Sequence, residues 1–466
     1  MRWAWGALLL ALVAADCTVG PDYHVPADAV ANAAGANGAF VNGGETAFVQ
    51  APLPDHWWRL YDDPRLDVYV RAALAANTDL RAADANLRRA TFAIREAQAA
   101  QTVSTIISGS IADTRQGGID ILSFPGYSYS IGGGISYPLD LAGGIRRAVE
   151  AARADAATVQ AVRDQVRVTV AAAVARNYVA VCSANQSLAA ADRVVGVERE
   201  TLDEVHRLFQ GGRNTAFDVT RAQTAVNQSA AAIPPIVAQR QAALYALAAL
   251  LGRPVANYPR EQQTCPTPPN LRQPLPIGDG AALIRRRSDV RAAERSLAAA
   301  TAAIGVETAQ LYPQVSIGGA LGFASPFSTI GSASSFGGNI GPLVSWTFPN
   351  LSVAHARIAE AGAAAEAAEA RFDGAVLTAL QQTETALDMY VREIAHNREL
   401  MQARNSAAKA TSQATTLFRF GRTGILDVLN AEANLATAET AVAASDAALA
   451  DDRVNVFLAL GGGWQS

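Results

Sequence analysis

Apolar and polar residues alternate along four short stretches of this chain, which are grouped in two pairs. The stretches are residues 103–112, 127–139, 314–324 and 338–348. In the first pair, one face carries apolar residues such as Ile107, Ile111 and Ile131, and the other face carries mainly Ser, Ala and Gly. A period of two predicts β-strands with one apolar face. Strands of about 9–12 residues are long enough to cross a bilayer when they are tilted.

Two interpretations of these strands are open on the pattern alone. They could form ordinary hairpins on a soluble core, or they could cross a membrane with their small, polar face lining water. Aromatic residues lie near the predicted strand ends, where side chains at a membrane interface belong. They are Tyr127, Tyr137, Trp346 and Phe348. The aromatic ends and the small opposite face favour the second interpretation.

A much longer helical pattern follows each strand pair. Residues 141–208 contain no proline, and a helix of this length extends roughly 100 Å, too far for the core of a compact domain. The corresponding helix of the second half is predicted at 352–418. There, spacings of four and three predict a coiled-coil seam through Val376, Leu380, Thr383, Leu387, Tyr390 and Ile394. In the first half, the seam is expected to step by four through Val162, Val166, Val170, Val174 and Tyr178.

A Gly-Arg turn ends each long helix. The turns are Gly212-Arg213 and Gly421-Arg422, and the chain is predicted to return in helices over 215–251 and 425–460. Pro234-Pro235 should interrupt the first return helix, because proline lacks a backbone donor and clashes with the preceding turn.

The sequence is internally duplicated. Residues 78–94 and 288–304 are identical at nine of 17 positions, and residues 208–219 match 417–428 at six of 12. Each half therefore repeats one unit of helix, two strands, long helix and return helix. We place the copies at 78–252, beginning with a helix near 78–100, and at 288–463.

The remaining segments lie around these two copies. They are an N-terminal segment at 17–77, which includes a first helix, a Pro-rich linker at 253–287 and a short tail at 464–466. Because the N-terminal segment and the linker lack long periodic patterns, we expect them to form a small mixed domain around the helices.

The first 16 residues are typical of a secretory signal peptide. Arg2 precedes an apolar run that ends at Ala15, which is too short to span a bilayer. Two cleavages are possible. Ordinary signal peptidase could cut after residues 13–15, or Cys17 could become the lipidated first residue of a lipoprotein, although Asp16 stands where a small residue is usual. Both routes take the mature chain out of the cytoplasm, and no later stretch is apolar enough for a membrane helix.

Composition changes this picture little. Half of the 466 residues are apolar but only 7% are aromatic, which suits closely packed Ala-rich helices. The net charge is −4 without a basic run, so a nucleic-acid footprint is not supported. The histidines are scattered, and no catalytic motif such as GxSxG or HExxH occurs. We expect neither an enzyme nor a bound metal or cofactor.

Besides Cys17, the chain has two cysteines, Cys182 and Cys265. Their spacing does not establish a disulfide. We therefore expect two unpaired thiols, with Cys182 acting as a small residue in helix packing.

Four membrane strands in one chain would leave two unpaired edges. Hydrocarbon offers no hydrogen bonds to such edges, so a membrane sheet must close with further copies of the chain. Two chains would supply eight strands and three would supply 12, and only the larger number leaves room for a lumen. The counting argument predicts an oligomer without deciding between a dimer and a trimer.

Four short motifs resemble the NodT-type outer-membrane efflux lipoproteins of the TolC-like outer membrane factor family. Residues 17–23 are similar to the mature start of these proteins, 57–64 to the entry of their first helix, 286–294 to their second-repeat signature and 460–464 to their ending. Ser288 stands where proline is common in that signature. The resemblance covers essentially the whole mature chain.

The resemblance implies a mainly α-helical, internally duplicated protein that forms a homotrimer. Its 12-stranded transmembrane β-barrel would stand in the outer membrane of a Gram-negative cell, above a 12-helix barrel that extends into the periplasm. Cys17 would carry the lipid anchor. The partners would be a periplasmic adaptor and an inner-membrane RND-type pump, with the adaptor docking at tip residues Gly212, Arg213, Gly421 and Arg422.

The same resemblance points to a gate at the helix tips. Asp427 matches a gate aspartate, Asn430 stands where a second aspartate is usual, and Leu426 stands where related lipoproteins carry a constricting Leu. The missing carboxylate argues against a strongly charged, cation-binding gate. Asp427 could instead be a simple helix N-cap after the turn.

The expected function is a passive outer-membrane exit channel for substrates delivered by a pump. Two rival functions remain. The chain could be the exit duct of an ABC-driven protein secretion system, or it could be a soluble periplasmic coiled-coil scaffold.

Overall fold

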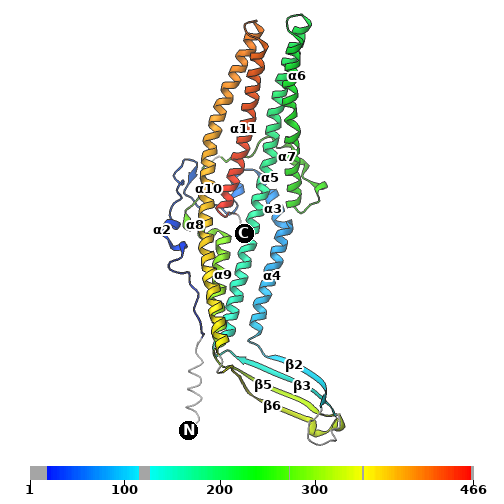
Figure 1. The fold of residues 1–466 in the computed structure, drawn as a ribbon, viewed down its shortest axis with the longest axis vertical. Helices are drawn as coiled ribbons and strands as arrows, with labels where there is room; N and C mark the ends of the chain where they lie inside the picture. The colour runs from blue at the N-terminus through cyan, green and yellow to red at the C-terminus, as the bar shows by residue number, and fades with distance from the viewer. Residues whose placement is uncertain (1–17, 115–125, 272, 349–350, 463–466) are drawn as a thin grey trace. The chain divides into compact units, whose positions relative to one another are not determined.

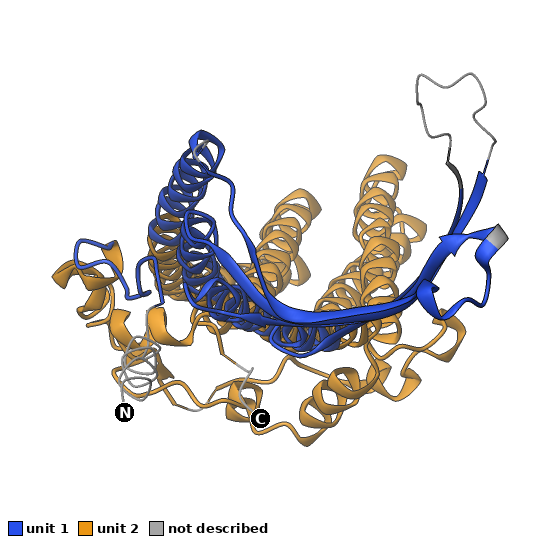
Figure 2. Ribbon diagram, turned by 90° about the horizontal axis from the view of Figure 1, so that it is seen from below, with its two compact units in different colours: residues 1–29, 86–160, 292–373 blue, residues 30–85, 161–291, 374–466 orange. Residues whose placement is uncertain are grey.

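The computed structural model describes residues 18–114, 126–271, 273–348 and 351–462. The signal peptide and the lipidation candidate Cys17 lie outside the described residues. The chain divides into two units, coloured in Figure 2. Unit 1 comprises residues 1–29, 86–160 and 292–373, and unit 2 comprises residues 30–85, 161–291 and 374–466. No described helix is both long enough and apolar enough to cross a membrane.

Unit 1 contains a four-stranded antiparallel sheet with the order β2-β3-β5-β6 (Figure 1). The strands are β2 (Ser104–Thr114), β3 (Gly126–Leu139), β5 (Gln314–Pro326) and β6 (Phe336–Ser345). β6 ends earlier than the predicted stretch 338–348, so Trp346 lies beyond it and donates through Nε1 to the carbonyl oxygen of Leu311 at 3.1 Å. The sheet joins the two copies at β3–β5, and within the described part of the chain one side of β2 and of β6 has no partner strand.

The register places apolar and small residues on opposite faces of this sheet. Residues directly opposite each other in an antiparallel pair share a face. Ile107 lies opposite Gly133, Ile131 opposite Phe323, and Gly319 opposite Ile340, so one apolar face runs through all four strands. On the other face, Ser110 lies opposite Ser130 and Gly132 lies opposite Gly322. The predicted division of the strands into one apolar and one small face is confirmed.

Two glycines on the small face allow the middle strands to approach closely. A Cβ on Gly132 would lie 2.9 Å from the carbonyl oxygen of Leu321, and a Cβ on Gly322 would lie 2.8 Å from that of Ile131. Both positions therefore exclude a side chain without a shift of the backbone. This is the situation in which glycine is found inside strands.

The helices of the two copies follow the predicted order. Copy one has α4 (Thr78–Ala99), α5 (Gly144–Gln210), α6 (Ala216–Ala231) and α7 (Ile233–Leu250), and copy two has α9 (Ser288–Ala309), α10 (Ser352–Arg419) and α11 (Ile425–Ala459). α5 and α10 contain 67 and 68 residues, or about 100 Å of helix each. The first return helix is divided at Ala232, directly before Ile233-Pro234-Pro235 begins α7.

Short polar side chains start several helices by accepting hydrogen bonds from free backbone N–H groups. Asp63 Oδ1 accepts from Arg65 N at 2.9 Å and so begins α3 (Pro64–Ala76). Asp140 accepts from the backbone of the first turn of α5, with 3.0 Å from Ile145 N to Oδ1. Asp279 Oδ1 accepts from Ala282 N at 2.7 Å and begins α8 (Gly280–Arg286), a helix inside the predicted linker 253–287.

The N-terminal segment from residue 30 onward and the linker both belong to unit 2, where they form short helices and strands. The short strands β1 (Phe48–Val49) and β4 (Leu275–Pro276) pair in parallel. The 3₁₀ helices η2 (Trp57–Tyr61), η3 (Val255–Asn257) and η4 (Arg260–Thr264) and the helix α2 (Ala34–Asn37) complete the region. Trp57 stacks on Phe457 of α11 with ring centroids 4.6 Å apart, which packs the N-terminal segment against the end of copy two.

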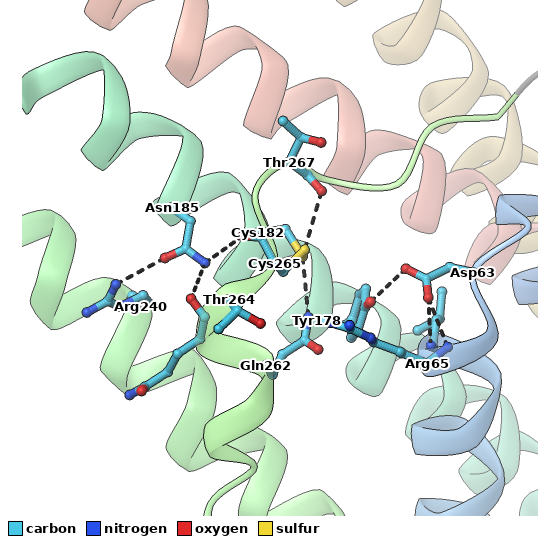
Figure 3. The surroundings of a disulfide bond; sticks show 12 residues. Asp63, Arg65, Tyr178, Cys182, Asn185, Arg240, Gln262, Thr264, Cys265 and Thr267 are labelled. Atoms are coloured by element: carbon cyan, nitrogen blue, oxygen red, sulfur yellow. Dashed lines mark hydrogen bonds between the residues drawn. A yellow bond between two sulfur atoms is a disulfide. The ribbon is translucent and has the colours of Figure 1, made fainter. Parts of the chain in front are cut away.

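Cys182 and Cys265 form a disulfide, so the expectation of two unpaired thiols was wrong. The bond joins α5 to the linker just after η4, and neighbouring polar contacts hold the same segment (Figure 3). Asn185 Nδ2 donates to the carbonyl oxygens of Gln263 and Cys265 at 2.9 and 2.7 Å. Arg240 of α7 donates to Asn185 Oδ1 at 3.1 Å. Sequence spacing missed the bond because the two cysteines lie 83 positions apart.

The predicted seam of α10 is buried, whereas the seam of α5 begins later than predicted. Val376, Thr383 and Leu387 of α10 are fully buried. In α5, Val170, Val174 and Tyr178 are buried, but Val162 is 45% exposed and does not belong to the seam in this chain.

Candidate functional site at the helix tips

The two Gly-Arg turns lie at the same end of unit 2 (Figure 1). Gly212 follows α5 and Gly421 follows α10, with φ of +68° and +67°. In each turn, the glycine N–H and the next N–H bond back to carbonyls of the last helical turn, with 2.8 Å from Arg213 N to Leu208 O and 2.9 Å from Arg422 N to Leu417 O. This is the Schellman motif, in which the left-handed position favours glycine. All four predicted tip residues are exposed.

The return helices begin differently in the two copies. In α6, Thr215 and Asp218 form a reciprocal capping box. The hydrogen bonds from the backbone and side chain of Thr215 lower the pKa of Asp218. In α11, Gly424 is the N-cap and offers no side-chain bond, while Asp427, three residues later, accepts from the Thr423 hydroxyl. Asp427 is therefore not the N-cap itself, which corrects that alternative.

A small hydrophobic cluster joins the two tips. It consists of the buried residues Val205 of α5, Ala222 of α6, and Ile425 and Val428 of α11, with Leu202, Val219, Ala414, Phe418 and Leu429 packed against it. Because the cluster contains residues from both copies, it holds the two helical hairpins together near their turns.

The three gate candidates lie on the opposite side of α11 from this cluster. Leu426, Asp427 and Asn430 are exposed, whereas their neighbours Ile425 and Val428 are buried. Spacings of three and four place residues 426, 427 and 430 on one face of the helix. The structure thus brings the three side chains together on a free surface of the chain.

Two aromatic residues at the tips were not singled out by the sequence. Phe420 precedes the turn glycine of copy two and is 77% exposed, and Phe217 lies in the first turn of α6 and is 65% exposed. Arg221 stacks over the Phe217 ring at 4.9 Å from its centroid. An aromatic residue directly beside a predicted turn is a signal that could have marked both positions.

A pair of buried glutamates lies below the hydrophobic cluster. Glu198 of α5 and Glu432 of α11 are 4% and 5% exposed. Ser229 Oγ of α6 donates to Glu198 Oε1 at 2.8 Å, and Thr201 Oγ1 of α5 donates to Glu432 Oε1 at 2.5 Å. Burial raises the pKa of both carboxyls. The pKa of Glu432 reaches about 7, where the Thr201 hydrogen bond lowers it and the charge on Glu198 raises it.

The sequence carries a signal for this pair, which is the position of each glutamate within an apolar heptad-like pattern. Residues 195, 198, 202 and 205 of α5 and residues 425, 428 and 432 of α11 follow heptad-like spacings of three and four. Each run places one glutamate among apolar residues on the buried face. A charged residue at a core position of such a seam is an exception that calls for a reason.

Among the described residues, no group of three or more His, Cys, Asp or Glu side chains could hold a metal ion. The surface of the tips consists of exposed glycine, arginine and aromatic residues and of the face that carries the three gate candidates. The acidic pair lies buried beneath this surface, among the helices that form the tips.

Comparison with known proteins agrees with this architecture. The sequence model of the family described as "Outer membrane efflux protein" matches residues 69–253 and 281–462, one segment in each copy. The chain is 29% identical to Nodulation protein T of Rhizobium leguminosarum bv. viciae, covering 98% of this chain and 93% of that protein. It is 28% identical to the probable efflux pump outer membrane protein TtgC of Pseudomonas putida, covering 97% and 94%. The solved structure of the outer-membrane channel OprN matches with a TM-score of 0.88 and 31% identity, covering 97% of this chain and 100% of that chain.

Proposed function

Because the chain belongs to the family of outer membrane efflux proteins, we propose that it is the outer-membrane channel of a tripartite efflux system. The chain lies in the outer membrane and extends into the periplasm. It conducts passively the substrates that a periplasmic adaptor and an inner-membrane pump hand over. The relative from P. putida is named as the outer membrane protein of an efflux pump, which supports a pump partner for this chain as well. The RND type is what the motif resemblance implies for that pump.

The observation that carries the proposal is the sheet of unit 1. Its apolar face is exposed, its other face is small and polar, and β2 and β6 each lack a partner strand on one side among the residues that the structure describes. Lipid solvates the first face and water the second, but neither edge can remain unpaired in hydrocarbon. Three copies close the sheet into 12 strands around a water-filled lumen.

The tips are the proposed docking and gating region. Phe217 and Phe420 flank Gly212, Arg213, Gly421 and Arg422, and together they offer an adaptor exposed aromatic rings beside cationic groups. Aromatic residues and Arg are enriched at the energetic centres of protein interfaces. Leu426, Asp427 and Asn430 form the constriction, with the free face of α11 turned toward the channel axis.

A lipid on Cys17 fits the start of the described chain. Val19 N donates to the carbonyl oxygen of Ala142 at 3.0 Å, and Arg147 binds the Val19 carbonyl at 3.0 Å and the Asp22 carboxylate at 2.7 Å. These contacts hold residues 19–22 at the junction between β3 and α5. When the strands cross the membrane, an acyl chain on the preceding residues attaches at the membrane boundary.

The experiment that tests the function combines efflux with conductance. A strain that lacks this gene should accumulate the compounds that its cognate pump exports, and the wild-type gene should restore their export. In planar bilayers, replacing Leu426, Asp427 and Asn430 together by Ala should raise the open fraction or conductance of the purified channel, because the constricting side chains are shortened.

The two readouts separate the proposals. Wild-type protein that restores no efflux with its cognate adaptor and pump contradicts the tripartite function. Unchanged conductance in the triple variant removes these three residues from the gate and leaves the channel function standing. If the gene instead restored secretion of a protein through an ABC exporter, the result would favour the rival function, an exit duct for protein secretion.

A further inference from the structure

The buried pair Glu198 and Glu432 has an unusual environment for two acids. Each carboxyl receives one hydroxyl hydrogen bond through Oε1, from Ser229 and Thr201 respectively. The Oε2 atom of each is buried without a hydrogen-bond partner. A buried carboxylate oxygen without a hydrogen-bond donor is costly, because nothing replaces the water that it loses.

The pair links three helices at the level where the two hairpins meet. Glu198 and Thr201 belong to α5, Ser229 to α6, and Glu432 to α11. Closer to the tips, Val428 of α11, one turn from Glu432, and Val205 of α5, one turn from Thr201, enter the hydrophobic cluster. A change in the charge of the pair therefore acts directly on the packing between α11 and α5.

Other charged groups border the site on its solvent side. A cavity of about 370 Å³ reaches Glu432 between α5, α10 and α11. Its charged lining residues are Glu200, Asp203, Glu204 and Arg207 of α5 and Arg419 of α10. Arg207 pairs with Glu204 at 2.5 Å, and α6 contributes the uncharged Ser229 hydroxyl. The cavity gives protons a route to Glu432.

We propose that Glu198 and Glu432 form a proton-binding site that keeps α11 packed on α5 while the pair holds a proton, and that loosens this packing when both carboxyls ionise. The charge on Glu198 acts on Glu432. Two carboxylates that interact in a site of low polarity repel each other, and protonation of one removes that repulsion. The titration belongs to the pair rather than to either residue. The site goes beyond the proposed channel function, because it concerns how readily the tip hairpins separate.

The direction of the pH effect follows from the raised pKa of Glu432. An unfolded or separated glutamate titrates near 4.5, whereas the packed one titrates near 7. The packed state therefore binds the proton more tightly, and its advantage is complete below about pH 4.5. That advantage is lost as the pH rises through about 7. Acid favours packed tips, and neutral to alkaline conditions favour separation.

Hydrogen exchange of the assembled, detergent-solubilised protein tests the proposal. After correction for the intrinsic effect of pH, backbone amides of residues 195–205 and 425–435 should lose protection as the pH rises from 5 to 8. For one linked proton, the opening equilibrium changes by up to about tenfold per pH unit. In Glu432→Gln, position 432 is neutral at every pH, so protection of these segments should depend on pH much less than in the wild type, with only Glu198 left to titrate.

Glu200→Gln is the control, because Glu200 is an exposed glutamate on α5, two residues from Glu198. It should retain the wild-type pH dependence. If Glu432→Gln also retains it, the proposal is overturned. If Glu432→Gln fails to assemble, infrared spectra of the wild-type protein test the proposal instead. A band of a protonated carboxylic acid should be present at pH 5 and disappear by pH 8. The proposal is supported if Glu198→Gln weakens this band. Absence of that band at pH 5 overturns it. Neither measurement involves transport, so failure here is distinct from failure to restore efflux.

Discussion

At the scale of single residues, the disulfide is the feature with the largest expected effect on stability. Cys182 belongs to α5 and is fully buried, and its partner lies in the linker, 83 positions later. Cross-linking a loop of this length lowers the entropy of the unfolded chain by an amount worth about 4–5 kcal/mol in the loop-closure account. The linker is thereby fastened to α5 independently of its few regular hydrogen bonds.

The double variant Cys182→Ala/Cys265→Ala should therefore unfold at a clearly lower denaturant concentration. Alanine is chosen because a serine hydroxyl at buried position 182 would add a polar group without a partner. The free energy of unfolding, from urea titrations of the solubilised protein, should fall by up to about 4–5 kcal/mol.

A reducing agent supplies the control for this prediction. It should lower the midpoint of the wild type toward that of the double variant and leave the double variant unchanged. Equal midpoints for the oxidised wild type, the reduced wild type and the double variant would show that the bond contributes nothing to stability.

Residue-scale predictions from sequence succeeded where a local pattern existed. Gly212 and Gly421 were found because a Schellman turn needs a left-handed residue directly after a helix. The cysteine pairing was missed because it depends on a tertiary contact between α5 and the linker. Glu198 and Glu432 were missed because motif searches look for exposed chemistry, whereas these residues reveal themselves only as charges in an apolar seam.

At the scale of elements, α10 and α11 are held in register by polar contacts at heptad spacing. Every seventh residue of α10 from Thr383 to Thr411 carries a polar group that contacts α11. The contacts are Thr383 to the Ala459 carbonyl, Tyr390 from Arg453, Asn397 to Ser445 and Asp446, Arg404 to Glu439, and Thr411 to the Ala431 carbonyl. Apolar seams tolerate sliding, but buried polar groups have few alternative partners. This series therefore prevents a shift of one helical turn.

Asn397→Ala tests the central contact of the series. Asn397 Nδ2 donates to Asp446 Oδ1 at 2.8 Å and to Ser445 Oγ at 3.1 Å, and both Asn397 and Ser445 are buried. Removing the amide takes a donor from the buried Ser445 hydroxyl and from the half-buried Asp446 carboxylate, so the free energy of unfolding should fall by about 1–3 kcal/mol.

Gln402→Ala on the same helix is the control for Asn397→Ala, because Gln402 carries an amide on the exposed side of α10. Its effect on the same denaturation curve should stay within about 0.5 kcal/mol. Equal small effects of both substitutions would mean that the polar series does not stabilise the hairpin.

The long helices were predictable because proline-free, Ala-rich sequence leaves few other conformations, and their predicted and observed ends differ by only a few residues. The seam of α5 was less predictable. Val162 continues the spacing of Val166 and Val170, but in this chain its side chain is exposed. Spacing alone could not predict this, because it does not reveal where the neighbouring elements that cover α5 end.

At the scale of the whole molecule, the sequence determines which face of the sheet each residue occupies, but not how many chains complete the sheet. The alternation of Ile107 with Ser108, or of Ile131 with Ser130, assigns each residue to a face whatever the number of subunits. Among the described residues, β2 and β6 each have one edge without a partner strand, and this is why we propose that further copies complete the sheet. The number of copies depends on how strongly the closed sheet curves. Neither the alternation of residues nor the structure of a single chain determines that curvature.

Neighbouring residues on β2 allow the two faces to be tested against each other. Ile107 is 87% exposed on the apolar face, and Ser108 follows it on the small face opposite Gly132. If the first face contacts lipid, Ile107→Arg places a charge in hydrocarbon and costs about 2–4 kcal/mol near the bilayer midplane. Membrane fractions should then contain less of the folded, heat-modifiable oligomer.

Ser108→Arg introduces the same side chain one residue away, on the face that we assign to the lumen. Oligomer yield should remain close to that of the wild type, while single-channel conductance and ion selectivity should change, because the added charge lies along the water-filled path. The comparison is sharp because the two variants share strand, depth and charge, and differ only in the face that carries the arginine. Equal loss of oligomer in both variants, or in neither, would mean that the two faces of the sheet do not meet lipid and water respectively.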